Sequence, residues 1–208
     1  MQICGIDDAG RGSMLGPLVI AGISLEKKNI RKLSALGVKD SKKLTAKRRE
    51  ELYKKIIPLV DNHYVAKISP KSIDISVVKH GLNQLEAKYM AKVVTKLDAD
   101  TSFVDSCDVN PKRFGKEISR LSNNKRIRSY HHADSRFVVV SAASILAKVT
   151  RDRAIAKLRK NYDLGSGYPS DTKTIDFVKK YYKKQKIMPK FVRKSWKPTK
   201  KILDKNYS

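Results

Sequence analysis

Residues 5–12 read Gly5-Ile6-Asp7-Asp8-Ala9-Gly10-Arg11-Gly12 and continue a short apolar run that begins at Ile3. Side chains alternate across a strand, so Asp7 and Asp8 reach one site only if the strand ends between them and the chain bends. The two glycines that follow permit such a bend and let a ligand approach the backbone closely. Paired carboxylates beside an arginine suit a divalent cation and a phosphate. An ordinary polar turn stays open as the alternative, because Asp and Gly are common in turns.

The apolar runs around this segment predict a mixed sheet. Residues 18–25 are rich in Val and Ile and follow the turn Gly16-Pro17, so we expect them to pair antiparallel with a strand at 3–7. Further strands are expected, in chain order, at 63–68, 101–104 and 126–130.

Helix signals fall between and after these strands. Thr45 is a suitable N-cap, and Asn110-Pro111 reads as an N-cap followed by proline at the first helical position. The expected helices are 46–57, 82–97, 111–121, 135–160, 172–184 and 191–203. Together the elements predict an α/β fold with a mixed five-stranded sheet flanked by helices and a C-terminal helical extension. We place a catalytic domain at 1–165 and a helical substrate-binding segment at 166–208, after the glycine-rich break at 165–169.

Composition limits the class of partner. The 208 residues carry 46 Lys and Arg against 20 Asp and Glu, a net charge of +26, which indicates a polyanion and most simply nucleic acid. An acidic membrane surface is the rival, but no lipidation signal is present and the longest apolar stretch is too short to span a bilayer. Two cysteines suggest neither a disulfide framework nor a zinc site. Without a secretory pattern at the start, we expect a cytoplasmic protein.

Four aspartates stand where predicted elements end: Asp7, Asp8, Asp105 and Asp134. Strand ends gather at one edge of an α/β sheet, where such proteins place their sites. Clustered carboxylates repel one another, and a bound cation removes that cost. Two ions held by aspartates can catalyse phosphodiester cleavage, and hard oxygen ligands favour Mg²⁺ or Mn²⁺. Taken singly, each aspartate could also be only a strand end or a helix N-cap.

Five motifs occur in order along nearly the whole chain, and together they resemble type 2 ribonuclease H (ribonuclease HII), especially its archaeal form. They are residues 5–12 with Gly16-Pro17, Asp40-Ser41-Lys42-Lys43-Leu44, residues 140–153, Gly165-Ser166-Gly167-Tyr168-Pro169-Ser170-Asp171, and Val192-Arg193-Lys194-Ser195-Trp196-Lys197.

The resemblance implies an RNase H-like fold and a metal-dependent endonuclease that cuts the RNA strand of RNA–DNA hybrids and ribonucleotides embedded in duplex DNA. The family's four acidic positions, which are catalytic and hold metal, fall on Asp7, Asp8, Asp105 and Asp134. Its substrate-binding positions fall on Gly10, Arg11 and Gly12 near the 2′-hydroxyl, on Tyr168 against the sugar at the RNA–DNA junction, and on Lys42 and Lys43 near the backbone.

Two positions depart from the family. Asp8 stands where glutamate is usual, and an aspartate reaches about 1.5 Å less, a difference that can cost on the order of 10²-fold in rate. Ser13 stands where proline is frequent. Both leave the family's overall pattern intact, but Asp8 makes the rate and the metal preference open questions.

Three hypotheses follow for the function. The first is a monomeric nuclease with two Mg²⁺ or Mn²⁺ ions that cuts 5′ to a ribonucleotide and leaves 5′-phosphate and 3′-hydroxyl ends. Its expected partners are RNA–DNA hybrid and duplex DNA containing ribonucleotides, and no membrane partner is expected. The second is a basic nucleic-acid-binding module with a weakened acidic site. The third is another nuclease of this fold, such as a junction resolvase.

Overall fold

The computed structural model describes residues 1–38 and 44–204. Its contacts divide the chain into two compact units. The first unit contains Met1–Ala9, Val19–Ala66 and Asn83–Thr150, and the second contains Gly10–Leu18, Lys67–Leu82 and the described residues from Arg151 onward. The predicted division into 1–165 and 166–208 stays a prediction.

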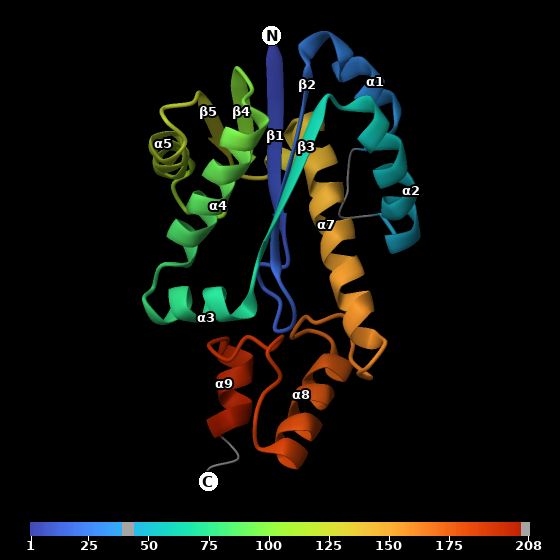
Figure 1. Cartoon of the computed structure of the whole chain (residues 1–208), viewed down its shortest axis with the longest axis vertical. Coiled ribbons are helices and arrows are strands. Elements are labelled where there is room, and N and C mark those ends of the chain that lie inside the picture. The colour runs from blue at the N-terminus through green and yellow to red at the C-terminus, as the bar shows by residue number, and fades with distance from the viewer. Residues whose placement is uncertain (39–43, 205–208) are drawn as a thin grey trace. The chain divides into compact units, whose positions relative to one another are not determined.

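A five-stranded sheet in the order β3-β2-β1-β4-β5 confirms the predicted fold class (Figure 1). The strands are β1 (Gln2–Ala9), β2 (Leu18–Glu26), β3 (Asn62–Ile68), β4 (Thr101–Asp105) and β5 (Ile127–Tyr130). β1 pairs antiparallel with β2 and parallel with β4, and β4 pairs parallel with β5. The sheet is therefore mixed, and the expected β1–β2 hairpin is present.

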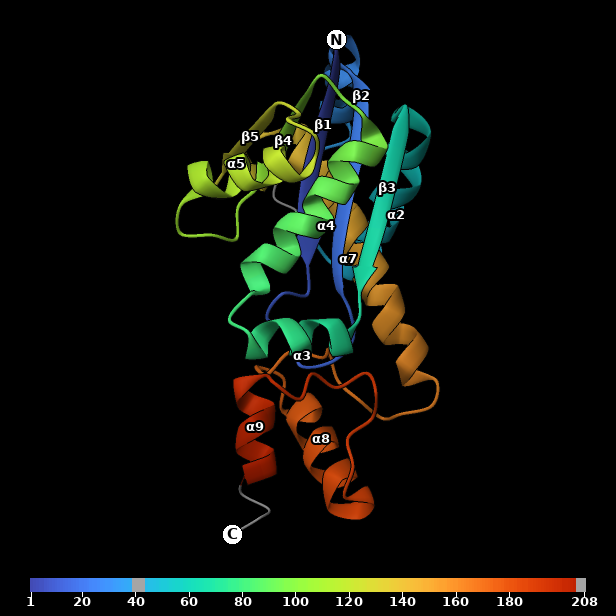
Figure 2. The ribbon, with the colours of Figure 1, turned by 60° about the vertical axis from the view of Figure 1, so that its left-hand side comes forward.

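Two long helices, α4 (Leu82–Leu97) and α7 (Val138–Arg159), cover opposite faces of this sheet (Figures 1 and 2). A Cβ atom on Gly5 would lie 2.2 Å from the carbonyl carbon of Val139 in α7, and one on Gly22 would lie 2.5 Å from a methyl group of Val93 in α4. Gly22 is the register partner of Ile6, the neighbour of Gly5, so the two glycines point to opposite faces. Each glycine lets one helix approach the backbone closely.

Side-chain caps define the shorter helices of the first unit. The Thr45 hydroxyl accepts from the amide of Arg48 at the start of α2 (Ala46–Ile56), as the sequence predicts. The Asn110 side chain likewise accepts from the amide of Arg113 at the start of α5 (Pro111–Leu121). The one-and-a-half-turn helix α1 (Ile30–Ala35) has no capping side chain and was not predicted. Apolar residues of β1, β2, α2 and α7 form the core, among them Ile3, Val19, Ala21, Ile23, Leu25, Leu52, Ile56, Val140, Ile145 and Leu146.

The second unit has its own small core and three helices. These are α3 (Pro70–Val78), α8 (Thr172–Gln185) and α9 (Lys197–Asp204). The core is made by Met14, Leu15, Ile155, Leu164, Val178, Tyr182, Met188, Val192 and Ile202. α3 was missed, although its Ser69 cap followed by Pro70 repeats the signal that located α5.

The structure corrects two predicted helix starts. α9 begins at Lys197 and not at residue 191, because residues 191–193 pair in extended form with the 14–16 segment: Gly16 N donates to Phe191 O at 2.8 Å and Arg193 N to Met14 O at 2.9 Å. The helix predicted from residue 135 begins at Val138, since Phe137 is extended (φ −123°, ψ 118°) and a separate turn, α6 (Ala133–Arg136), precedes it.

Candidate active site

Asp7 is a buried carboxylate on the α7 face of the sheet. It follows Gly5 by two positions on β1, so it points to the same face as Gly5 does. Its pKa is raised to about 7, first by burial and second by the negative charge of Asp105. Three groups oppose this rise: the Ser144 hydroxyl, the positive charge of Lys148, and the Asp8 amide, which donates to Asp7 Oδ1 at 2.7 Å. Ionising Asp7 in the folded protein therefore costs free energy, and these three groups reduce that cost.

Asp105 ends β4 beside Asp7. The parallel register pairs Ile6 with Val104, so the next residue on each strand is one of these aspartates. The amide of Ala133 donates to Asp105 Oδ1 at 2.6 Å, which holds this carboxylate against the start of α6. The structure brings these two acids together as the sequence predicts, although only Asp105 ends its strand, since β1 continues to Ala9.

Asp134 follows Ala133 directly and is buried in the first turn of α6. His132, the residue immediately before α6, is in the left-handed conformation (φ 52°), which turns the chain between β5 and α6. The bond between Ala133 and Asp105 therefore brings the backbone of Asp134 next to the pair. Asp134 lies inside this short helix and precedes the long helix α7, as the sequence predicts.

The predicted bend between Asp7 and Asp8 is absent. β1 continues through both residues to Ala9, with Asp7 opposite Ala21 and Asp8 opposite Ile20 on β2. In a regular strand the two side chains then point to opposite faces, and Asp8 faces the α4 side. Pairing with β2 straightens this segment, because each residue keeps its place in the antiparallel register.

Ser144 and Lys148 complete the surroundings of Asp7, and the sequence analysis did not assign them this role. They lie four residues apart on α7, so they share one side of the helix. Ser144 is fully buried and Lys148 half-buried. A serine and a lysine at this spacing in the mostly apolar first half of the helix were the available signal.

The donor chemistry of the Asp7–Asp105 pair fits a divalent cation. A cation would offset both the burial and the mutual repulsion that raise the pKa of Asp7, and hard carboxylate oxygens suit Mg²⁺ or Mn²⁺. Within residues 1–38 and 44–204, however, no group of three or more His, Cys, Asp or Glu side chains is placed to hold a metal ion together. The site made by four carboxylates stays a prediction.

The second unit contains the glycine–arginine turn and Tyr168. Gly10 and Gly167 both have φ of +87°, a conformation that favours glycine. The Met14 and Leu15 amides both donate to Gly167 O, at 2.7 and 3.2 Å, so the turn and the Tyr168 loop are bonded to each other. Two segments far apart in sequence therefore form one surface feature, in which Gly12 is exposed and Arg11 and Tyr168 are half-buried. Lys42 and Lys43 lie outside the described residues.

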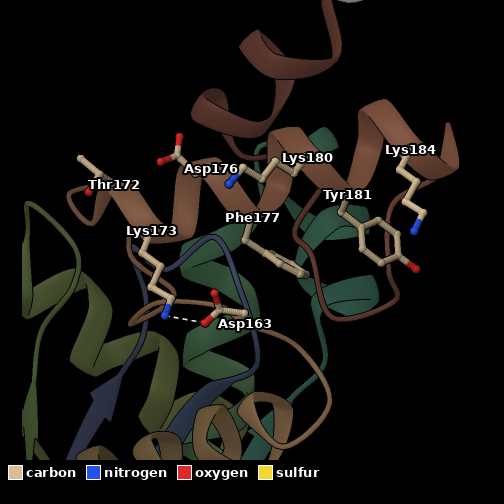
Figure 3. A pocket seen from close by; sticks show the side chains of 8 residues that line it. All are labelled: Asp163, Thr172, Lys173, Asp176, Phe177, Lys180, Tyr181 and Lys184. Atoms are coloured by element: carbon tan, nitrogen blue, oxygen red, sulfur yellow. Dashed lines mark ion pairs between the residues drawn. The ribbon is translucent and has the colours of Figure 1, made fainter.

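A hollow of about 530 Å³ runs along α8 (Figure 3). Lys173, Lys180 and Lys184 line it together with Phe177 and Tyr181. Lys173 is paired with Asp163 at 2.5 Å. Asp176 also lines the hollow, so three lysines face two aspartates there, with aromatic rings between the lysines. Every helix in the described part of the chain is too short or too polar to cross a bilayer.

Comparison with known proteins gives consistent results over the whole chain. A family model described as Ribonuclease HII matches residues 4–199. Ribonuclease HII of Cenarchaeum symbiosum is 55% identical over 202 residues, which cover 97% of this chain and 98% of that protein. Ribonuclease HII of Thermococcus sibiricus is 48% identical over 210 residues, with 99% and 92% covered.

Solved structures of archaeal type 2 ribonucleases H are similar to this chain over nearly its whole length. The structure of ribonuclease H2 from Pyrococcus horikoshii has a TM-score of 0.94 at 42% identity and covers 100% of both chains. The RNase HII of Archaeoglobus fulgidus, solved as a complex with PCNA, has a TM-score of 0.88 at 37% identity and covers 96% of both chains. Bst-RNase HIII, solved in complex with Mn²⁺, has a TM-score of 0.84 at 21% identity, covering 98% of this chain and 70% of that one, and shows a shared fold alone.

Proposed function

Because this chain belongs to the ribonuclease HII family and is therefore a ribonuclease H, we propose that it cuts the RNA strand of RNA–DNA hybrids and cleaves 5′ to single ribonucleotides in duplex DNA, leaving 5′-phosphate and 3′-hydroxyl ends. The observation that carries the proposal is the buried Asp7 beside Asp105, with a pKa raised to about 7. A bound cation would offset the cost of burying such a repulsive pair of carboxylates.

Asp7, Asp8, Asp105 and Asp134 are our proposed ligands for two Mg²⁺ or Mn²⁺ ions. When bound, such ions activate the attacking water and stabilise the leaving oxygen. The protein's own part is to hold the ligands: the Asp8 amide and the Ser144 hydroxyl fix Asp7, and the Ala133 amide fixes Asp105. Because β1 continues through Asp8, its side chain lies on the sheet face opposite Asp7, so Asp8 would reach a bound ion only through a water or a shifted backbone.

Substrate recognition is assigned to the second unit and to the lysine motif. Gly10, Arg11 and Gly12 would contact the ribonucleotide and its 2′-hydroxyl, and Tyr168 would stack on the sugar; close approach to glycine backbone suits such recognition. Lys42 and Lys43 would bind backbone phosphates. These contacts position the duplex without reading its sequence.

The 166–208 segment is proposed to bind duplex backbone through the hollow on α8. Its lysines project from one side of the helix, and Tyr181 lies beside Lys184 (Figure 3). Cations spaced along a helix can follow a phosphate backbone, and affinity should then fall steeply with salt. We also propose that the enzyme works as a monomer in the cytoplasm.

One assay tests the activity. Duplex DNA with a single ribonucleotide is incubated with the enzyme while Mg²⁺ and Mn²⁺ are titrated, and an all-DNA duplex of the same sequence is the control. Cleavage 5′ to the ribonucleotide that depends on metal is the expected result. Binding without cleavage would instead support the nucleic-acid-binding module, and preferential cutting of a four-way junction would support a resolvase.

A further inference from the structure

Arg151 is a buried arginine in the second unit that contacts both proposed recognition segments. It is only 4% exposed. Its Nη2 donates to Ser13 Oγ at 3.0 Å and to the Ser166 carbonyl oxygen at 2.5 Å. Its guanidinium carbon lies 4.2 Å from the centre of the Tyr168 ring, in the range of a cation–π contact. One side chain thus joins the glycine–arginine turn to the Tyr168 loop.

The glycines of the two motifs leave room for this guanidinium. A Cβ on Gly10 would lie 3.3 Å from Arg151 Nε, and a Cβ on Gly167 would lie 2.9 Å from Arg151 Nη2. Any larger residue at 167 would push the guanidinium away from Tyr168. Arg151 therefore adds to the need for glycine at both places, together with the left-handed backbone and, at Gly10, the Pro17 carbonyl oxygen at 3.0 Å.

Ser13 completes the connection. Its hydroxyl accepts from Arg151 and lies 2.8 Å from the Leu15 carbonyl oxygen and 2.9 Å from the Gly167 carbonyl oxygen, so its single hydrogen can be donated to either. The proline frequent at this position in the family could make neither bond. The departure noted in the sequence thus adds a hydroxyl that links the turn, the loop and the arginine.

We propose that Arg151 is a positioning residue: it holds the Tyr168 ring and the 10–13 turn in one fixed arrangement and so sets how strictly the enzyme requires a ribonucleotide. The proposal rests on the proposed function, in which Tyr168 and Gly10–Gly12 contact that nucleotide. The planar guanidinium offers donors in a fixed geometry together with a face for stacking, and a lysine would keep a donor but neither that geometry nor that face. Phosphate contacts elsewhere would still bind the duplex, so the effect should appear in kcat more than in KM.

The test is a double-mutant cycle with steady-state kinetics on the single-ribonucleotide duplex. The variants are Arg151→Met, Arg151→Lys, Ser13→Ala, Tyr168→Ala and the Arg151→Met/Tyr168→Ala pair. A misplacement of about 1 Å can cost on the order of 10²-fold, so we expect Arg151→Met to lower kcat by roughly 10- to 100-fold with KM changed less than about threefold. Arg151→Lys and Ser13→Ala should show smaller losses of the same kind. If Arg151 acts through Tyr168, the pair should be no slower than the slower single variant.

Arg159→Met is the matched control. It removes the same charge from α7, and Arg159 also donates to the loop, its Nη2 lying 3.0 Å from the Gly165 carbonyl oxygen. Its effect should add to that of Tyr168→Ala. Thermal melting of each variant separates slower chemistry from a smaller folded fraction. If Arg151→Met does not fold, the kcat values of Ser13→Ala and Arg151→Lys test the inference in its place.

The inference would be overturned if the losses of the two single variants multiplied in the pair, or if Arg151→Met and Ser13→Ala both had wild-type kcat. In either case the proposed function would stand as long as Tyr168→Ala is impaired. A wild-type enzyme that does not cut the substrate, or a Tyr168→Ala variant as fast as wild type, would instead remove the proposed function and the inference with it.

Discussion

Replacing Asp7 by asparagine should stabilise the metal-free protein at pH 8. The substitution keeps the size of the side chain and one acceptor oxygen for the Asp8 amide or the Ser144 hydroxyl. It removes the buried negative charge that faces Asp105. At pH 8 the wild-type carboxylate is mostly ionised, so the folded protein carries the full cost of burial and repulsion.

The magnitude follows from the pKa of Asp7. Its value of about 7 against an ordinary 3.8 means that ionising Asp7 in the folded protein costs about 4 kcal/mol more than in the unfolded chain, at about 1.4 kcal/mol for each tenfold change. The attraction of Lys148 for the carboxylate is already contained in this net cost, so asparagine forgoes in addition only one hydrogen bond, worth about 1 kcal/mol. We therefore expect a net gain of roughly 1–3 kcal/mol in the free energy of unfolding.

The sign of the pH dependence gives a second readout. The folded protein holds a proton on Asp7 between pH 3.8 and about 7, where the unfolded chain has lost it, so this group's contribution to the free energy of unfolding falls as pH rises through that window and is constant above it. The Asp7→Asn variant should lack this decrease.

Urea unfolding at pH 5 and pH 8 with EDTA measures both effects. The exposed Asp176→Asn serves as the control for losing one carboxylate, and it should change little at either pH. An Asp7→Asn protein less stable than wild type at pH 8 would refute the reasoning, because it would mean that the folded state favours the charge at residue 7.

The other predictions concern catalysis and the groups around Asp7. Asp105→Asn should abolish cleavage of the single-ribonucleotide duplex while binding, measured by fluorescence anisotropy in EDTA, is kept or strengthened; near-normal turnover would contradict the metal assignment. Asp8→Glu should raise the rate, since a longer side chain recovers about 1.5 Å of reach, and a clear drop would show that the shorter residue is built into this site. Ser144→Ala should raise the pKa of Asp7 further, because the hydroxyl stabilises the anion; a carbon-13 NMR titration of the metal-free protein would measure it, and an unchanged or lower pKa would count against that role.

Local signals located most of the fold. Thr45 and Asn110 accept hydrogen bonds as N-caps where the sequence predicts them, and the antiparallel pairing of β1 with β2 follows from two apolar runs joined by the glycine-rich segment 10–17. These features depend on neighbouring residues, so the sequence suffices. The predicted start of α9 at residue 191 was wrong because residues 191–193 form hydrogen bonds with the 14–16 segment. No local sequence pattern encodes that contact.

The candidate site shows the same limit. The amino-acid sequence alone indicated that Asp7 and Asp105 lie at or near the ends of two strands, because apolar runs and their breaks mark where strands end. Only the tertiary structure decided that β1 runs straight through Asp8, that Ser144 and Lys148 face Asp7, and that Arg151 joins Ser13 to Tyr168. The physical reason is that these relations depend on register and on helix packing, which bring together residues that are far apart in the chain.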